Sequence, residues 1–453
     1  MARKLAKRSG RVKLAAGALA LVFAVRLAAQ DPPEAPPASH ATPGPSAPPG
    51  AIARSNVDEK ALAATVEALV ACGTRHSLSS WDDPQRGIGC GRDRILQRYR
   101  GIAAAAGTRW EVVVDRFEAT SPRTRDAAAR FENVVAILPG TDPVLARTAF
   151  VTAGHFDSMP SSVMDPKSDA PGADDDASGV AAALEAARLL AGGRYRATLV
   201  FAALSGEEQG LIGGTRLLAF LRERGLAVGG FLDNDIVGAD PAPGGPHRVR
   251  VFSGGGPDGM DSPSRDLARA VEEIAGRDAV RLVFRTDRLG RGGDHQPFVE
   301  AGLPAVRLTE PLENYDHEHQ TPRVENGHEY GDLPKFLDFR FLGNVARVNA
   351  ETLRVLALAP AAPREVALTG GVTPDAKVAW AADPDSERAG FEILWRETTD
   401  PRWSVATFVA EPGETVMTGV STDNRFFAVR SVGKNGARSI PVAAEPKRTS
   451  PKK

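Results

Sequence analysis

Three successive segments decide the fold, namely TAFVTA at residues 148–153, ASGVAAALEAARLL at 177–190 and ATLVFAAL at 197–204. The first and the last are apolar runs of the length of a buried strand, and the middle one carries apolar residues at helical spacing. A strand, a helix and a second strand in this order are typical of an α/β protein with a largely parallel sheet. Functional groups in such sheets gather at the carboxyl ends of the strands, so we expect the chemistry of this protein there.

The same alternation continues on both sides of this unit, from residue 57 to about residue 358. Further strand-like segments lie at 110–117, 131–138, 229–237, 249–252 and 305–308. Further helix-like segments lie at 58–71, 92–106, 211–224 and 334–358. The whole pattern predicts a three-layer α/β/α sandwich with a mostly parallel, mixed central sheet, which we place at residues 55–358.

The C-terminal part has a different pattern. Short strand-like runs, separated by Gly, Pro, Asp and Asn, lie at 366–368, 376–380, 391–395, 404–408 and 426–432. This spacing predicts a small all-β sandwich over residues 363–445, and it resembles a fibronectin type III module with Trp380 as an early core aromatic. Such a module could bind a surface or a partner, or pack on the rest of the chain. Residues 446–453 form a basic tail.

The composition excludes several classes of protein. The 453 residues include 56 basic and 57 acidic side chains, which gives a net charge of −1 and argues against a nucleic-acid partner. Hydrophobic residues make up 42% and charged residues 25%, as in ordinary globular proteins. With only two cysteines, Cys72 and Cys90, a disulfide scaffold or a Cys-rich zinc finger is excluded, so a metal site would use His, Asp and Glu.

The N-terminal end has the pattern of an export signal. Within residues 1–30, basic side chains precede an apolar run at 14–25, and small residues follow it near 28–30. The run has about 12 residues, whereas a membrane span needs ~20, so we expect cleavage and no stable membrane insertion; an uncleaved anchor is the alternative. Cleavage would remove seven basic side chains and no acid, which changes the net charge from −1 to −8.

A Pro- and Ala-rich linker follows at residues 31–54, a composition that favours extended chain over a packed core. Export predicts a periplasmic or extracellular location. Such oxidising conditions would allow a disulfide between Cys72 and Cys90, and two buried thiols are the alternative.

Five stretches rich in metal-binding residue types follow predicted strands or lie in nearby loops: GHFDS at 154–158, PGADDDASG at 171–179, SGEEQG at 205–210, LDNDIVG at 232–238 and ENYDHEHQT at 313–321. Taken singly, each has an ordinary explanation, such as a loop pair, a helix cap or two solvated acids. Together they recur after strands in a chain with only eight histidines. They therefore indicate a metal centre at the carboxyl edge of the sheet.

Three features of these stretches favour metal chemistry. Consecutive aspartates at 174–176 repel one another unless cations neutralise them. The adjacent acids Glu207 and Glu208 allow one to bind a metal while the other acts as a general base. An aspartate in an apolar strand is costly unless it is paired or metal-bound, which singles out Asp235, with Asp233 as the rival.

In kind, order and spacing, the five stretches resemble the M28 family of zinc metallopeptidases, the aminopeptidase group with co-catalytic zinc, over about residues 55–358. The resemblance implies two Zn²⁺ ions per chain and peptide substrates with a free N-terminus. It assigns five metal ligands, two to each ion and one shared: His155 and Asp235, Glu208 and His319, and Asp175. It also makes Glu207 the general base and Asp157 the partner that orients His155.

The resemblance leaves some alternatives open. His317 competes with His319 as the late ligand, although Gln320 and Thr321 after His319 follow the family pattern. The segment Asp294–His295 lines the site in the family without binding metal. Alternatives in function are a glutaminyl cyclase or another amide hydrolase of the same fold, and a non-catalytic binding ectodomain. The ligand set would also accept Co²⁺ or Mn²⁺. The sequence states neither the preferred N-terminal residue nor the oligomeric state.

Overall fold

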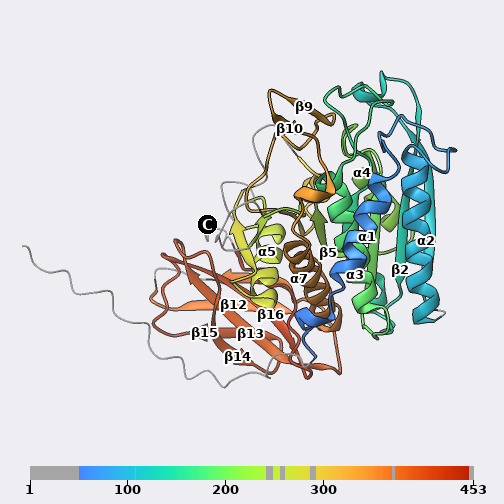
Figure 1. Ribbon diagram of the computed structural model, residues 1–453. Coiled ribbons are helices and arrows are strands. Elements are labelled where there is room, and N and C mark those ends of the chain that lie inside the picture. The colour runs from blue at the N-terminus through green and yellow to red at the C-terminus, as the bar shows by residue number, and fades with distance from the viewer. Residues whose placement is uncertain are drawn as a thin grey trace, which may run out of the picture. The chain divides into compact units, whose positions relative to one another are not determined.

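The computed structural model describes residues 50–107, 109–240, 248–255, 261–285, 292–369 and 373–447 (Figure 1). The predicted export signal, most of the linker at 31–54 and the end of the basic tail at 448–453 lie outside the described residues. Among the helices that are described, none has the length and apolar character needed to cross a membrane.

The centre of the larger region is an eight-stranded mixed sheet in the order β1-β2-β4-β3-β5-β8-β6-β7. Its strands are β1 (Glu111–Ala119), β2 (Ala129–Leu138), β3 (Thr148–His155), β4 (Thr198–Leu204), β5 (Ala227–Asn234), β6 (Val249–Phe252), β7 (Val280–Val283) and β8 (Ala305–Thr309). The central strands β4, β3, β5 and β8 run parallel, whereas β1, β2 and the β6–β8 pair add antiparallel contacts. The predicted α/β class with a mixed sheet is confirmed.

Helices cover both faces of this sheet (Figure 1). They are α1 (Glu59–Val70), α2 (Ile88–Ala106), α3 (Gly179–Leu190), α4 (Ile212–Glu223), α5 (Pro263–Ala275), α6 (Gln296–Glu300) and α7 (Phe339–Leu358). Side chains of a strand alternate between faces, so Val134 of β2 packs in the core with α1, α2, α3, α5 and α7, and its neighbour Val135 packs in the core with α4 and α6. Two cores on opposite faces give the three layers that the sequence predicts.

A side-chain cap sets the start of the last helix. The helical pattern at 334–358 predicts one helix, but the structure has a short 3₁₀ turn at Pro334–Phe336 before α7 begins at Phe339. The side chain of Asp338 accepts hydrogen bonds from the backbone nitrogens of Arg340 and Phe341. A carboxylate in this position is a strong N-terminal cap, so the helix starts there.

The C-terminal part forms two four-stranded sheets, in the orders β15-β12-β11-β18 and β14-β13-β16-β17. Their strands are β11 (Arg364–Thr369), β12 (Ala376–Ala381), β13 (Arg388–Glu397), β14 (Ser404–Val409), β15 (Gly413–Met417), β16 (Arg425–Gly433), β17 (Val442–Ala443) and β18 (Glu445–Pro446). All pairs are antiparallel except β11–β18. Both sheets contribute to one core, where the ring of Trp380 lies 5.6 Å from that of Phe391. The resemblance to fibronectin type III stays a prediction.

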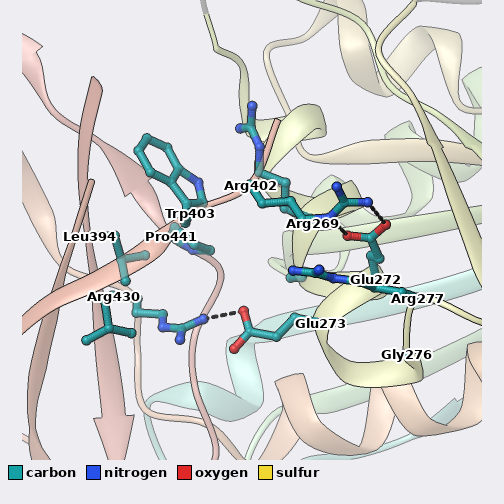
Figure 2. Close-up of a pocket in the computed structure, with 12 residues that line it drawn as sticks. Arg269, Glu272, Glu273, Gly276, Arg277, Leu394, Arg402, Trp403, Arg430 and Pro441 are labelled. Atoms are coloured by element: carbon teal, nitrogen blue, oxygen red, sulfur yellow. Dashed lines mark hydrogen bonds and ion pairs between the residues drawn. The ribbon is translucent and has the colours of Figure 1, made fainter. Parts of the chain in front are cut away.

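Ion pairs join helix α5 to these C-terminal sheets (Figure 2). Arg402 contacts Glu272 at 2.6 Å, and Arg430 contacts Glu273 at 2.6 Å. The indole nitrogen of Trp403 donates to a carboxylate oxygen of α5, on Asp266, at 2.9 Å. A cavity of about 270 Å³ lies among these side chains, and no histidine occurs among the described residues that line it. The module therefore packs on the rest of the chain through ion pairs, and Ala437 adds an apolar contact with Val355.

Candidate metal centre

The three strands that carry the metal-capable stretches are neighbours in the order β4-β3-β5. His155 is the last residue of β3 and lies opposite Leu204, the last residue of β4. β5 ends at Asn234, so Asp235 lies just beyond the strand and not within it, because the chain turns at Ile236, whose φ is 58°. The carboxyl ends of parallel strands meet at one edge, and the ligand-type side chains gather there.

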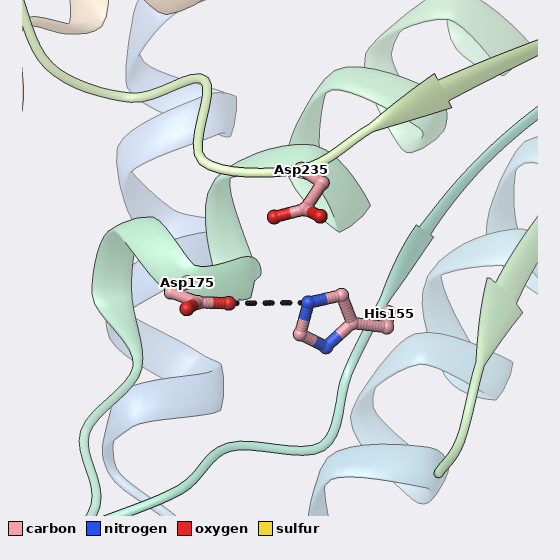
Figure 3. Close-up of side chains that lie close together, drawn as sticks. All are labelled: His155, Asp175 and Asp235. Carbon is pink, nitrogen blue, oxygen red and sulfur yellow. Dashed lines mark ion pairs between the residues drawn. The ribbon is translucent and has the colours of Figure 1, made fainter. Parts of the chain in front are cut away.

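Asp175 lies between two histidines. Its Oδ1 is 3.1 Å from Nε2 of His155, and its Oδ2 is 2.8 Å from Nε2 of His319. His155, Asp175 and Asp235 form one group whose ligand atoms lie within 4.8 Å of one another, and Asp175, Glu208 and His319 form a second. Figure 3 shows the first group, with the His155 ring and the Asp175 carboxylate facing each other. Two groups that share one carboxylate form two adjacent candidate positions for metal ions.

The structure also separates the rival residues from these groups. His317 stacks on Phe336 with ring centroids 3.7 Å apart, outside both groups. Asp233 accepts from the backbone nitrogen of His295 at 3.0 Å, and its Oδ2 lies 3.1 Å from the ring nitrogen Nδ1. Asp294 accepts a hydrogen bond from the first turn of α4, at Gly214. Asp233 and the 294–295 segment thus support the wall of the site.

The electrostatics of the two groups suit cations. Burial alone would lower the pKa of His155, but hydrogen bonds to Asp157 and Asp175 raise it well above its ordinary value. Burial likewise opposes protonation of His319, whereas Glu208 and Asp175 raise its pKa to about 12. The carboxylates that raise these pKa values would also attract a metal cation, and the mixture of imidazole and carboxylate ligands fits Zn²⁺.

Asp157 connects the two halves of the site. Its carboxylate accepts hydrogen bonds from the backbone nitrogens of Gly206, Glu207 and Glu208 at 2.9, 3.3 and 3.2 Å. Its carbonyl oxygen lies 3.1 Å from Nδ1 of His155, an arrangement that leaves Nε2 as the ligand atom. Burial would raise the pKa of Asp157, but contacts with His155, the backbone nitrogen of Glu208 and the hydroxyl of Ser77 lower it. Oδ1 of Asp157 lies 3.5 Å from Nδ1 of His155, so one ionised side chain contacts both the first histidine and the acidic turn.

Glu207 lies in this turn between β4 and α4 and belongs to neither metal group. Its pKa is raised well above the ordinary value, first by burial and then by the negative charge of Glu208 and Asp235. Its side chain is half-buried beside the ligands. It is placed to exchange a proton with a molecule bound at the centre.

The three consecutive aspartates have three different partners. Asp175 belongs to the metal groups. Asp176 accepts from the backbone nitrogens of His155 and Gly179, both at 2.9 Å, and so joins β3 to the start of α3. Asp174 accepts from the backbone nitrogen of Gly238 at 2.6 Å. The sequence left metal binding and helix capping as alternatives for these aspartates. In the structure Asp175 belongs to the candidate metal groups, and Asp176 bonds the start of α3.

Sequence reasoning missed three buried supports of the site. Asp332 accepts from the backbone nitrogens of Asp174 and Asp175, both at 2.8 Å, and burial raises its pKa to about 7. Arg75 donates to backbone carbonyls on both sides of the site, including Phe156 at 2.7 Å. Arg307 contacts Asp235 at 2.8 Å. Only Arg307 had a visible signal, as a charged residue within an apolar strand.

Cys72 and Cys90 are joined by a disulfide, with Cα atoms 5.8 Å apart. Both are buried, and the bond connects the end of α1 to the first turn of α2. The helix predicted at 92–106 accordingly starts earlier, at Ile88.

Comparison with known proteins identifies a matching family model and related sequences. The model of peptidase family M28 matches residues 133–353. A probable zinc metalloprotease of Leptosphaeria maculans is 40% identical over 86% of this chain and 94% of its own length. A second, from Pyricularia oryzae, is 40% identical over 85% of this chain and 82% of its own. These matches extend well beyond residues 133–353, so the relatives share more than the part that the family model covers.

Two solved structures share the fold. The LapA aminopeptidase of Legionella pneumophila superposes with a TM-score of 0.50 at 17% identity, over 67% of this chain and 73% of that one. The glutaminyl cyclase of Fimbriiglobus ruber superposes with a TM-score of 0.50 at 18% identity, over 69% of this chain and 99% of that one. At such low identity these structures bear on the fold alone.

Proposed function

The chain belongs to peptidase family M28, with probable zinc metalloproteases as relatives, and from this premise we propose that it is an exported aminopeptidase that uses two zinc ions. The observation that carries the proposal is the position of Asp175, whose two oxygens each face a histidine. A carboxylate so placed would be shared by two metal ions, as the ligands of two-metal hydrolases are.

The ligands would divide as the two groups divide: His155 and Asp235 to one ion, Glu208 and His319 to the other, and Asp175 to both. Zinc held there would supply Lewis-acid chemistry, since it polarises a carbonyl oxygen and lowers the pKa of a water molecule.

In the proposed reaction, side chains of the protein perform the proton transfers. Glu207 takes a proton from the attacking water and delivers it to the nitrogen of the leaving amine. Asp157 keeps Glu207 in place through the backbone of the turn, and it orients His155. Release of the N-terminal residue then consumes one water for each peptide bond.

The test of specificity uses matched peptides followed by mass spectrometry. We expect the first residue to be released from a peptide with a free N-terminus, and no cleavage of the same peptide after N-acetylation. Internal cleavage of both peptides would contradict the aminopeptidase assignment. A third peptide with N-terminal glutamine tests the alternative, because a glutaminyl cyclase would release ammonia from it and leave every peptide bond intact.

Export is proposed on two grounds. The pattern of residues 1–30 is that of a signal peptide. The disulfide between Cys72 and Cys90 is a bond that persists mainly in oxidising compartments. Fractionation of the native host, with N-terminal sequencing of the mature protein, tests both export and cleavage near residue 30.

The C-terminal sheets are proposed to bind a surface or partner in addition to packing on α5. The support is their fold class alone, since the contacts described for them are with the rest of the chain. A pull-down on intact cell envelopes, with and without residues 363–445, tests this role.

A further inference from the structure

Arg307 is a fully buried arginine in the middle of β8, next to the candidate ligand Asp235. Its exposed fraction is 0%, and its Nε lies 2.8 Å from Oδ2 of Asp235. The next residue of the same strand, Leu308, accepts a hydrogen bond from the backbone nitrogen of Asp235 at 3.1 Å. Strand β8 therefore holds Asp235 at both its backbone and its side chain.

This contact restricts how the carboxylate of Asp235 can turn. The guanidinium faces Oδ2 of the same carboxylate that contributes to the group formed with His155 and Asp175. Carboxylates that bind metals are commonly fixed by an outer hydrogen-bond partner, and loss of that partner weakens metal binding. A buried guanidinium is costly unless it is paired, so the pairing with Asp235 is a built feature of the strand.

The carboxylates around Arg307 give its positive charge a second role. Besides Asp235, the carboxylates of Asp175, Asp176 and Glu207 lie at this end of the sheet. Like charges so close together would drive the Asp235 side chain away from its neighbours unless something held it. The positive charge of Arg307 also repels an incoming metal ion, but the Asp235 carboxylate that contacts Arg307 largely neutralises this charge.

We propose that Arg307 is a positioning residue, which holds Asp235 by one oxygen and thereby sets the zinc affinity of the His155–Asp235 site and not that of the Glu208–His319 site. This inference rests on the two-zinc centre proposed above. It concerns the zinc affinity of one of the two sites, which can be measured without following the reaction.

The experiment is a zinc titration of metal-free protein by calorimetry, with a competing chelator for tight sites. We expect the wild type to bind two zinc ions. Arg307→Met should weaken one site by about 10–100-fold and leave the other unchanged. Arg430→Met is the matched control, since Arg430 is a buried arginine paired with Glu392 and Glu273 in the C-terminal part; its zinc binding should equal that of the wild type.

A double variant identifies the affected site. In a His155→Ala background, which removes the first site, adding Arg307→Met should leave the affinity of the remaining zinc unchanged. If Arg307→Met does not fold, as circular dichroism would show, Arg307→Gln replaces it under the same criteria. Wild-type or tighter binding at both sites in the variant would overturn the role of Arg307 alone. A wild type that binds fewer than two zinc ions would overturn the two-zinc proposal as well.

Discussion

Asp157 accepts a hydrogen bond at 3.2 Å from the backbone nitrogen of Glu208, a residue 51 positions further along the chain. The contact joins the loop after β3 to the turn after β4. Since Oδ1 of the same aspartate lies 3.5 Å from Nδ1 of His155, a ligand from each of the two proposed zinc sites contacts one buried carboxylate.

Removal of this charge is therefore expected to affect both sites. Asp157→Asn keeps the size of the side chain but loses the ionised acceptor, and outer-shell changes of this kind cost about 10–100-fold in metal affinity or activity. Zinc titration and kcat/KM would measure the loss. Ser77→Ala is the control, because it removes a single donor to Asp157, at 3.0 Å, and should have a much smaller effect.

Replacement of the general base should separate chemistry from metal binding. Glu207→Gln is expected to lower kcat by about 10²–10⁴-fold, the usual contribution of a positioned proton acceptor. Its zinc content should match that of the wild type, because Glu207 belongs to neither metal group. Wild-type turnover in this variant would exclude Glu207 as the base.

Loss of the disulfide should lower stability without altering the centre directly. The bond between Cys72 and Cys90 spans 18 residues. The chain-entropy model gives about 3 kcal/mol for a loop of this length. Urea unfolding of the Cys72→Ser/Cys90→Ser variant, compared with the wild type, measures the difference in the free energy of unfolding. An unchanged midpoint and slope would show that the bond contributes nothing.

The contact between α5 and the C-terminal sheets should depend strongly on Asp261. This buried carboxylate pairs with Arg269 at 2.7 Å and with Arg396 at 2.5 Å. Asp261→Ala leaves both buried guanidinium groups short of a partner, and breaking a buried pair costs about 3–5 kcal/mol.

Thermal and urea unfolding would measure this cost. Glu414→Ala provides the control, since its pair with Lys377 is solvent-exposed and is expected to contribute about 0–1 kcal/mol. Equal losses in the free energy of unfolding in the two variants would mean that burial does not increase the contribution of the Asp261 ion pairs.

Much of the centre follows from strand patterns in the sequence. His155 and the 205–210 turn come directly after apolar runs, and the carboxyl ends of parallel strands meet at one edge, so their proximity was predictable. The choice between Asp233 and Asp235, by contrast, depends on where β5 stops, because two residues this far apart in one continued strand would point to the same face. The end of β5 at Asn234 and the turn at Ile236 separate them.

The partners of other residues in the centre could not be predicted from local patterns, even where one of them, Arg307, stands out as a charge in an apolar strand. Asp332 and Arg307 reach the centre from segments remote in sequence, and they act on the Asp174–Asp175 backbone and on Asp235 through contacts that only the tertiary fold creates. The position of His319 rather than His317 in the metal group likewise depends on the packing of His317 against Phe336.

The proposed function requires that Asp175 belong to both zinc sites and that release of N-terminal residues depend on the bound zinc. The most direct test measures zinc per chain in the purified mature protein, together with hydrolysis of aminoacyl-p-nitroanilides before and after chelation. We predict about two zinc ions per chain, loss of activity on chelation and its return when zinc is added. One zinc ion or none, or activity that survives complete removal of metal, would contradict the account.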